Sequence, residues 1–360
     1  MSKRNHVLIL GGTGAIGRHL ISELKDKNYH IDITTRQSKV STVDNIQFIC
    51  GNAKDTTFVY SIINSKKYDC IIDLMLYNTN EFEERYKNIL LNCRHYIFVS
   101  TYRVFSNIEN QLIDENSPRL LDNVEDSEYL KTDDYALTKA RQEDILFKSD
   151  IKNWTIVRPS ITYSSNRFQL GVFERDIILS RANMRLEVPM PKEILDKYTT
   201  MTWGGDVAKM IEKLILNKDA YSESYNTVSH EYKTWRQVAR YYEDNIGISV
   251  RVVNEEHFIP LVTSFWQYKY DRTINRCCDN TKILKVTGLS KGDIMKLEDG
   301  LKLELSNYCS DIEFPARFNG RIDRVLKITN LNLNGTLKNT IKYIVGRIKI
   351  IDYLFTKLGF

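Results

Sequence analysis

Long apolar runs are missing from this 360-residue sequence. No stretch of about 18 or more apolar residues is present, so the sequence predicts no transmembrane helix. The N-terminus, MSKRNHVLILGG, passes from charged residues directly into a short apolar run and carries no signal-peptide cleavage pattern. These absences favour a cytoplasmic protein.

Cysteine motifs that bind metals or form redox pairs are missing as well. The six cysteines are Cys50, Cys70, Cys93, Cys277, Cys278 and Cys309. Apart from one adjacent pair they lie far apart, and none forms a CxxC or a Cys/His ligand set. The sequence therefore predicts reduced, mostly buried thiols and no metal site.

Excess charge of one sign is absent from most of the chain. The net charge is +5, but residues 316–360 carry nine Lys or Arg against two acids, which leaves the remainder close to neutral. A uniformly basic protein favours nucleic acid as a partner, whereas a basic tail on a near-neutral body does not. With 42% hydrophobic and 27% charged residues, the chain has the composition of a globular protein with one large domain or two interleaved ones.

The first 160 residues alternate short apolar runs with helical patterns, which is typical of βαβ units around a parallel sheet. Strands are predicted at 6–10, 30–35, 46–50, 70–76, 95–100 and 154–158, with a helix over 15–27. Continuous apolar runs of this kind predict an α/β fold with a doubly wound, Rossmann parallel sheet.

After Pro159 this regularity weakens, which indicates a smaller substrate-binding lobe interleaved with the sheet. We expect an NAD(P)-binding Rossmann domain over residues 1–165, completed by a returning strand near 225–229. The lobe would take residues 166–315, including a helix over 234–247, and a basic helical extension would take 316–360.

The sequence ends on a segment whose apolar residues recur at roughly helical spacing. They are Leu337, Ile341, Ile344, Ile348, Ile351 and Phe355, with Lys338, Lys342, Arg347 and Lys349 available for a polar face. The pattern predicts one amphipathic helix. A contact in a homo-oligomer or packing onto the lobe is the first interpretation, and peripheral attachment to an anionic membrane is the alternative.

A glycine-rich loop joins the first predicted strand to the first predicted helix. Gly11, Gly14 and Gly17 stand there in a GxxGxxG register. The first permits a tight turn, the second a close approach of backbone to a pyrophosphate, and the third close packing of helix on strand. Because the helix N-terminus also offers free N–H groups to phosphates, we expect dinucleotide contacts from these glycines and from Ala15 and Ile16. A purely structural turn is the alternative.

The end of the second predicted strand bears on which dinucleotide binds. NAD sites place an acid there for the ribose 2′-hydroxyl, and an arginine nearby accommodates the 2′-phosphate of NADP. This strand ends with Arg36 and without an acid, since Asp32 lies in mid-strand. The sequence therefore leaves NAD and NADP open and favours NADP, with Arg36 and Asn52 among the predicted cofactor contacts.

Four polar residues suggest chemistry at an alcohol carbon. Ser100 and Thr101 lie at the carboxyl end of a predicted central strand, at the edge of the sheet where ligands bind. Tyr135 and Lys139 lie one helical turn apart, so their side chains share a face. A phenol can exchange the proton of the alcohol, an ammonium can lower the pKa of that phenol, and a Ser or Thr hydroxyl can orient the substrate. An ordinary pair on a helix surface is the alternative.

The ordered set of motifs resembles a known family. GxxGxxG, the strand-end Ser/Thr, YxxxK, VRPSITY (157–163) and TTMTWGGDVAKMI (199–211) follow the order of the extended short-chain dehydrogenases/reductases that act on nucleotide sugars, the NAD-dependent epimerase/dehydratase family. The resemblance covers roughly residues 6–290. It implies that Thr101 is the catalytic Ser/Thr, Tyr135 the acid/base and Lys139 its partner, and that Pro159 and Ser160 flank the nicotinamide.

Two departures narrow the activity that the resemblance implies. Related 4,6-dehydratases carry an Asp-Glu pair after the catalytic threonine, whereas Tyr102 and Arg103 follow Thr101 here. Dehydration is therefore disfavoured, although Glu115 or another acid could substitute. The segment EFEERYKNILLNCR is short enough for a single helix, which is similar to an atypical branch, some of whose members bind RNA. In the common epimerases this helix contributes to a dimer interface, so its shortness argues against that dimer here. We expect a homo-oligomer whose interface is not assigned.

The resemblance implies an enzyme that oxidises or reduces a carbon, C4 by preference, of a nucleotide-activated sugar. An epimerase would keep its cofactor and return the hydride to the other face of the sugar, and a ketoreductase would consume NADPH. The competing class is a non-catalytic dinucleotide- or RNA-binding protein on the same scaffold. The basic tail supports that class, and the complete set of Thr101, Tyr135 and Lys139 opposes it.

Overall fold

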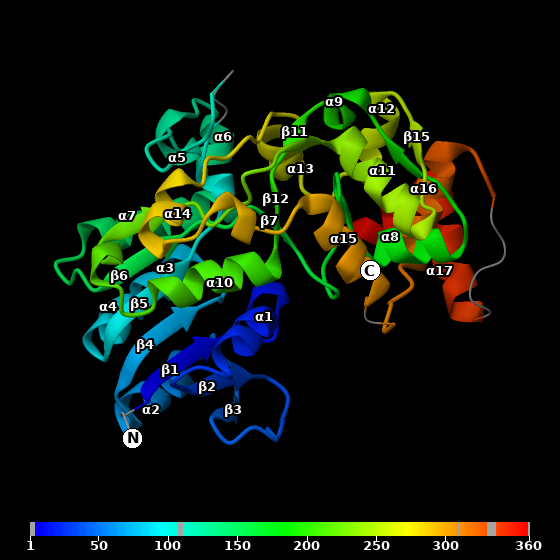
Figure 1. Ribbon diagram of the computed structural model, residues 1–360. Helices are drawn as coiled ribbons and strands as arrows, with labels where there is room; N and C mark the ends of the chain where they lie inside the picture. The colour runs from blue at the N-terminus through cyan, green and yellow to red at the C-terminus, as the bar shows by residue number, and fades with distance from the viewer. Residues whose placement is uncertain (1–3, 107–110, 309, 330–335, 359–360) are drawn as a thin grey trace. The chain divides into compact units, whose positions relative to one another are not determined.

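The computed structural model describes residues 4–106, 111–308, 310–329 and 336–358, and these form two compact units. The first unit comprises Met1–Ser164, Thr200–Tyr232 and Cys277–Leu297, and the second Ser165–Thr199, Lys233–Arg276 and Glu298–Phe360. Each unit is therefore built from three separate stretches of chain, as the colours of Figure 1 show. The basic C-terminal residues, expected as an extension of their own, fall within the second unit.

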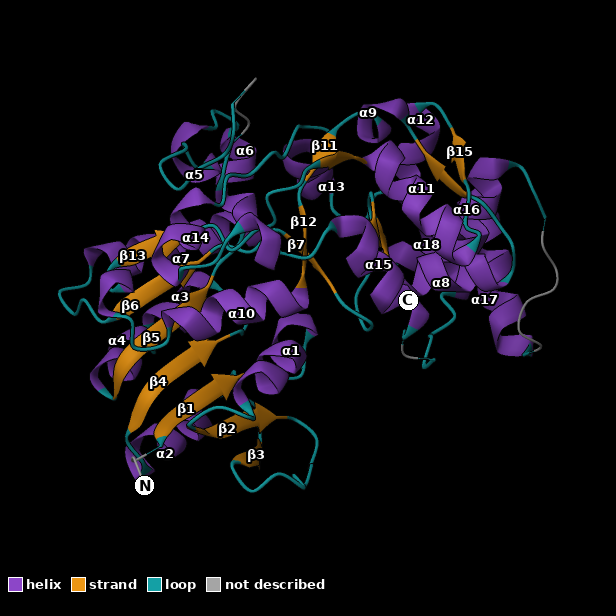
Figure 2. Ribbon diagram, viewed as in Figure 1, coloured by secondary structure: helices purple, strands orange, loops and turns teal. Residues whose placement is uncertain are grey.

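A seven-stranded parallel sheet forms the centre of the first unit (Figure 2). In spatial order its strands are β13 (Glu223–Tyr225), β6 (Trp154–Val157), β5 (Cys93–Val99), β4 (Tyr68–Asp73), β1 (Asn5–Leu10), β2 (Tyr29–Thr35) and β3 (Ile46–Cys50). The strand order reverses beside β1, as in doubly wound sheets that bind dinucleotides. The predicted α/β fold class is confirmed.

Helices cover both faces of this sheet. Those of the first unit are α1 (Ala15–Leu24), α2 (Thr56–Ser65), α3 (Thr79–Glu83), α4 (Tyr86–Leu91), α5 (Leu120–Asn123), α6 (Ser127–Leu130), α7 (Tyr135–Lys148), α10 (Gly204–Leu214) and α14 (Thr281–Thr287), with 3-10 turns η1 (Tyr102–Val104), η2 (Lys218–Ala220) and η5 (Lys291–Asp293). Two short strands, β7 (Ile161–Tyr163) and β12 (Met201–Trp203), pair in parallel beside them.

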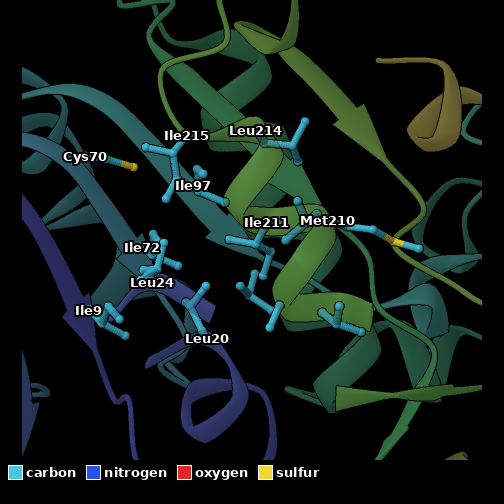
Figure 3. Close-up of a cluster of buried hydrophobic side chains, with 14 of the residues drawn as sticks. Ile9, Leu20, Leu24, Cys70, Ile72, Ile97, Met210, Ile211, Leu214 and Ile215 are labelled. Carbon is cyan, nitrogen blue, oxygen red and sulfur yellow. The ribbon is translucent and has the colours of Figure 1, made fainter. Parts of the chain in front are cut away.

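One face of the sheet packs against α1 and α10. Figure 3 shows Leu20 and Leu24 of α1 and Ile211 of α10 directed toward Ile9 and Ile72 of the sheet. All five side chains are fully buried. On the other face, α2, α3, α4 and α7 bury a second apolar cluster against the alternate residues of the same strands. Burial on both faces explains why these strands read as continuous apolar runs in the sequence.

Two predicted elements of this unit are wrong in detail. The segment expected as a single helix is two short helices, α3 and α4, separated at Arg85. The Arg85 guanidinium is buried and donates to the carbonyl oxygens of Ala53 (3.1 Å) and Lys54 (2.7 Å), a long-range contact that turns the chain between the helices. The returning strand is β13, which ends at Tyr225 where a strand was expected to begin.

The second unit contains short strands and more helices than strands. Its strands are β8 (Gln169–Leu170), β9 (Phe173–Glu174), β10 (Val188–Met190), β11 (Tyr198–Thr199), β14 (Lys233–Thr234) and β15 (Val250–Val252). Its helices are α8 (Arg175–Asn183), α9 (Lys192–Leu195), α11 (Trp235–Ile246), α12 (Glu255–Phe258), α13 (Phe265–Gln267), α15 (Leu297–Ser306), α16 (Ala316–Leu326), α17 (Leu337–Arg347) and α18 (Lys349–Lys357), with a 3-10 turn η3 (Ile259–Leu261) and a π-helical turn η4 (Tyr268–Arg272).

The C-terminal segment, predicted as one amphipathic helix, forms two. The helical conformation breaks at Ile348, whose φ of −98° and ψ of 105° are extended, so α17 ends and α18 begins there. Helix α17 crosses α16 so closely that a methyl group at Gly346 would overlap the carbonyl oxygen of Arg317. Within the described residues, every helix falls short of the length and apolarity that crossing a membrane requires.

The cysteines are more varied than expected. Cys70 and Cys278 are buried, Cys93 and Cys277 are half-buried, and Cys50 is exposed at the end of β3. The prediction of mostly buried thiols is therefore wrong for Cys50, while Cys309 lies outside the described residues.

Candidate active site

The glycine loop makes the turn from β1 into α1. Gly11 has a φ of +78°, a left-handed conformation that favours glycine, and its N–H donates to the Thr34 hydroxyl (3.0 Å). A side chain at Gly11 would also meet the Met75 sulfur, 2.6 Å from its Cβ. At Gly17, a Cβ would overlap the backbone of Gly12, so this glycine lets the helix pack directly on the loop.

The start of α1 carries backbone N–H groups that lie ahead of its first intrahelical bond. Gly14 is the N-cap residue, and a Cβ there would meet open space. The first helical N–H groups belong to Ala15, Ile16 and Gly17, which precede the first intrahelical bond, from Arg18 N–H to the Gly14 carbonyl (3.1 Å). Unpaired N–H groups and the helix dipole both favour phosphate at such a terminus.

Asp32, the acid of β2, is engaged away from the tip of its strand. Asp32 is buried in mid-strand, where its carboxylate accepts hydrogen bonds from Lys66 Nζ (2.8 Å) and from the Tyr68 hydroxyl (2.6 Å). Arg36 follows the carboxyl end of β2, and its side chain is exposed. The tip of β2 therefore presents a cation.

The remaining predicted cofactor residues follow strands at the same edge of the sheet. Asn52 comes after β3, is exposed, and accepts a hydrogen bond from a backbone N–H two residues on. Pro159 comes after β6, and its carbonyl accepts the N–H of Tyr102 (3.0 Å). The neighbouring Ser160 hydroxyl is buried and lies 2.6 Å from the Thr202 hydroxyl. These contacts fix the loop between β6 and β7.

Lys139 is buried at the carboxyl ends of two central strands. Its ammonium donates to the carbonyl oxygens of Val99 (2.8 Å) and Met75 (3.2 Å), and the side chain is 1% exposed. Burial lowers the pKa of Lys139 to about 8, while the carboxylates of Asp73 and Glu143 act in the opposite direction. The site therefore holds a tunable ammonium in a water-poor environment.

Tyr135 is the first residue of α7, and two polar groups fix its position. Asp134 caps the helix by accepting the N–H of Ala136 (3.0 Å). The Arg103 guanidinium stands over the Tyr135 ring, with its central carbon 5.4 Å from the ring centre, and lies 3.7 Å from the Asp134 carboxylate. Thr101 is buried at the start of η1, and its hydroxyl oxygen accepts the Arg103 N–H (3.2 Å). The structure thus brings the strand end after β5 to the start of α7.

Glu143 organises this region and was missed in the sequence. It is fully buried and accepts hydrogen bonds from the Ser100 hydroxyl (2.6 Å) and from Arg158 Nε and Nη2 (both 2.8 Å). Arg119 contributes a second cation at 3.4 Å. The signal was available, because Glu143 continues the Tyr135 and Lys139 face at the next helical turn. Through these bonds Arg158, which follows β6, anchors the end of that strand to α7.

The stability of the protein should depend on the protonation of Lys139. Its pKa is about 8 in the folded protein, against an ordinary value of 10.5. Between these values the unfolded chain binds a proton that the folded protein lacks, so stability should rise with pH by up to about 1.4 kcal/mol per pH unit. Below about pH 8 both states are protonated and this contribution is flat.

Lys139→Met removes the titrating group. Urea titrations at a series of pH values should show that the free energy of unfolding of the wild type rises relative to that of the variant between about pH 8 and pH 10.5. A difference that does not change with pH would contradict a buried ammonium with a lowered pKa.

The comparisons with known proteins agree with this architecture. The family described as RmlD substrate binding domain matches residues 5–291, most of the chain. An "Epimerase family protein" of Staphylococcus epidermidis is 50% identical over 42 residues, which is 12% of this chain and 14% of the relative. That match therefore covers only a small part of the relative's length.

Several solved structures share the fold. The chain is similar to dTDP-glucose 4,6-dehydratase from Bacillus anthracis in complex with NAD (TM-score 0.65, 16% identity, covering 84% of this chain and 96% of that one). It is also similar to UDP-glucose 4-epimerase from Thermotoga maritima with UDP-glucose (TM-score 0.61, 16% identity, 84% and 97%). A third is the Bordetella bronchiseptica enzyme WbmG with NAD and UDP (TM-score 0.63, 15% identity, 83% and 92%).

At these identities the structural likeness establishes the fold, and the family match over residues 5–291 establishes descent. The chain therefore belongs to the RmlD substrate binding domain family, and it shares its fold with solved structures that include a dTDP-glucose 4,6-dehydratase and a UDP-glucose 4-epimerase.

Proposed function

We propose that the protein is an NAD(P)-dependent nucleotide-sugar epimerase or ketoreductase that transfers hydride at a sugar carbon, C4 by preference. Tyr135 is the acid/base, Lys139 tunes it, and Thr101 orients the reacting hydroxyl. The bound nicotinamide would accept or return the hydride. The side chains of the protein would orient the sugar and move the proton.

The buried ammonium of Lys139 is the observation that carries the proposal. A charge without a bonded carboxylate is costly to bury, and perturbed lysines of this kind cluster at functional sites. Here the ammonium donates to two carbonyl oxygens at the strand ends, and its third N–H would donate to a cofactor ribose. A pKa of about 8 keeps most of the population charged at neutral pH. That charge would lower the pKa of the Tyr135 phenol.

Proton transfer follows from this arrangement. The Tyr135 phenolate would take the proton of the sugar hydroxyl as the carbon is oxidised, and the phenol would return it on reduction. The Thr101 hydroxyl, placed at the β5 end, would hold the reacting oxygen by a hydrogen bond. In an epimerase the keto-sugar would rotate between the two transfers, and the cycle would be redox-neutral.

The residues after Thr101 oppose dehydration. Elimination of water needs an additional acid and base beside the sugar, and Tyr102 and Arg103 occupy the positions where related dehydratases have carboxylates. Tyr102 is buried, and Arg103 presents a cation to the Tyr135 ring. Glu115, the acid that could substitute, accepts the Asn226 N–H (2.7 Å) and is held there.

The cofactor proposal covers both dinucleotides. The glycine loop has room for a pyrophosphate, because the space beside Gly14 is open. Position 11 requires glycine, because a side chain there would meet Met75. Solved relatives of the same fold contain NAD, which supports NAD here as well. The exposed Arg36 after β2, with Asp32 engaged by Lys66, supports NADP, and we keep that preference as the proposal to be tested.

Arg36→Ala should weaken NADPH binding by about tenfold and change NADH binding by less than about twofold, because only NADPH carries a 2′-phosphate. Isothermal titration with each cofactor measures both dissociation constants. Lys39→Ala, another exposed cation a few residues further on, is the matched control and should leave both unchanged. Equal losses for the two cofactors would remove Arg36 from the recognition of the phosphate.

Native mass spectrometry of the purified protein, followed by assays on a panel of nucleotide sugars, tests the function. Copurified NAD(H) with redox-neutral turnover would identify the epimerase. Loss of NADPH absorbance on addition of a keto-sugar nucleotide would identify the reductase. Turnover of neither kind, together with salt-sensitive binding of RNA, would overturn the proposal in favour of a binding protein.

A further inference from the structure

Exposed apolar side chains gather on the two C-terminal helices. Of the 21 large hydrophobic residues that are exposed in the described part of the chain, nine lie within residues 337–358. They are Leu337, Ile341, Ile344, Ile348, Ile350, Tyr353, Leu354, Phe355 and Leu358. Monomeric proteins rarely leave so dense an apolar surface in water, so this group, the C-terminal stripe, calls for a partner.

The stripe is the outer face of helices that are already packed on their inner face. Leu337, Ile341 and Ile344 recur at helical spacing along α17 and Ile348 follows at its C-terminal cap, on a different side from the buried Tyr343. The Tyr343 hydroxyl donates to the buried Asp323 of α16 (2.7 Å). Because the inner face already packs on α16, the unit does not need the exposed side chains of the stripe for its own packing.

The exposed charged residues within residues 336–358 are all cations. Lys338, Lys342, Lys349 and Lys357 are exposed beside the stripe. Asp352, the single acid in residues 336–358, is buried. The outer surface of α17 and α18 therefore combines apolar side chains with cations.

The buried Asp352 itself lies in an excess of positive charge. Three guanidiniums of α16 share its carboxylate: Arg317 Nε at 2.8 Å, Arg321 Nε at 2.9 Å and Arg324 Nη2 at 3.4 Å. One carboxylate neutralises one of these three charges. The cluster keeps a net positive charge and a capacity to bind a further anion, since guanidinium groups suit phosphate.

A pocket of about 600 Å³ opens at this cluster. Its wall is mainly apolar, with Phe314, Phe318 and Phe355 among its residues, and its charged lining is Arg317, Arg321 and Lys342 against one acid, Glu313. Apolar walls beside cations suit a molecule with a hydrocarbon part and an anionic head.

We propose that α17 and α18, with the pocket beside α16, bind the surface of a bilayer that contains anionic phospholipid. The helices are 11 and 9 residues long, so they lie along the interface rather than across it. The stripe enters the acyl boundary, and the lysines and the arginine cluster meet the phosphates.

Charge also decides against a second copy of the chain as the occupant. A two-fold contact would bring the stripe of one protomer against the same stripe of the other, with four exposed lysines on each side. Like charges at such close range are repulsive, whereas an anionic bilayer complements both the apolar and the cationic part of the surface.

Vesicle flotation of the full-length protein tests the proposal. The wild type should float with vesicles of phosphatidylglycerol and phosphatidylcholine in about equal amounts, and should not float with phosphatidylcholine alone. Ile341→Glu combined with Ile350→Glu should weaken binding by at least about tenfold, since both apolar contacts become charges. Each of Lys338→Ala and Lys349→Ala should weaken it about fivefold, and added salt should do the same.

Leu303→Glu is the matched control, because Leu303 is an exposed apolar residue of α15 in the same unit, outside the stripe. It should float as the wild type does, and thermal unfolding should show that all variants are folded. Wild type that stays out of the anionic vesicles overturns the proposal, and so does a double variant that floats normally. A wild-type dimer that the double variant dissociates, without flotation, would instead assign the stripe to self-association.

Discussion

Tyr135→Phe should lower turnover by about 10²–10⁴-fold and leave cofactor affinity within about twofold of the wild type. The substitution removes one oxygen, the one that we propose exchanges the proton of the sugar hydroxyl. The ring would still pack beneath the Arg103 guanidinium, and the start of α7 would keep its Asp134 cap. The loss should therefore fall on kcat rather than on the binding of the dinucleotide.

Tyr129→Phe is the matched control for this experiment. Tyr129 is buried close to the same helix start, and its hydroxyl donates to the Asp134 carboxylate (3.1 Å). Losing that bond should cost roughly 1 kcal/mol of stability and leave turnover within a few-fold. Steady-state rates on the active nucleotide sugar and fluorescence titration of the cofactor give the two readouts.

Two results would contradict the assignment of Tyr135. A Phe variant with a near-normal rate would mean that another group moves the proton. A variant whose cofactor affinity falls as far as its rate would mean that Tyr135 acts in binding. The comparison with Tyr129 separates either result from a general disturbance of α7.

The parts of the site that the sequence predicts are those encoded by neighbouring residues. The glycine spacing, the strand ends and the turn between Tyr135 and Lys139 are local patterns with one structural solution in a parallel sheet. The strand order then brings the ends of β4 and β5 to Lys139. These features need no knowledge of long-range packing.

The features that the sequence does not predict depend on contacts between distant residues. Arg85 separates α3 from α4 because carbonyl oxygens some 30 residues earlier bind its guanidinium. The break at Ile348 lets Asp352 of α18 reach the arginines of α16. Periodicity alone describes one helix in each case, because such partners are set by the tertiary fold.

Glu143 is the clearest example, and its removal gives the largest stability effect that we expect. Glu143→Ala should lower the free energy of unfolding by about 3–5 kcal/mol, because it would leave buried cations without their counter-charge. Arg158 is 2% exposed and makes two of its bonds to this carboxylate, and the Ser100 hydroxyl makes a third. Truncating the Glu143 side chain to a methyl group would also open a cavity beneath the end of β5.

Asp144→Ala is the matched control, since the two acids are adjacent on α7 and both pair with Arg119. The Asp144 carboxylate lies 2.6 Å from Arg119 Nη2, but its side chain is 30% exposed. Water can replace this partner, so the cost should stay below about 1 kcal/mol. Urea denaturation of both variants measures the contrast, and equal losses would mean that the Glu143 network contributes no more than a surface pair.

The same variant connects stability to the proposed chemistry. Glu143 raises the pKa of Lys139, which opposes the effect of burial. Without Glu143 that pKa should fall below about 8, so the ammonium would lose its proton at a lower pH than it does in the wild type. Glu143→Ala should therefore lose turnover near neutral pH. The assay is run without urea and at low temperature, so that the variant stays folded. Activity that returns as the pH is lowered would identify Glu143 as a positioning residue acting through Lys139. Activity lost equally at every pH would leave Glu143 a purely structural part of the β5 end.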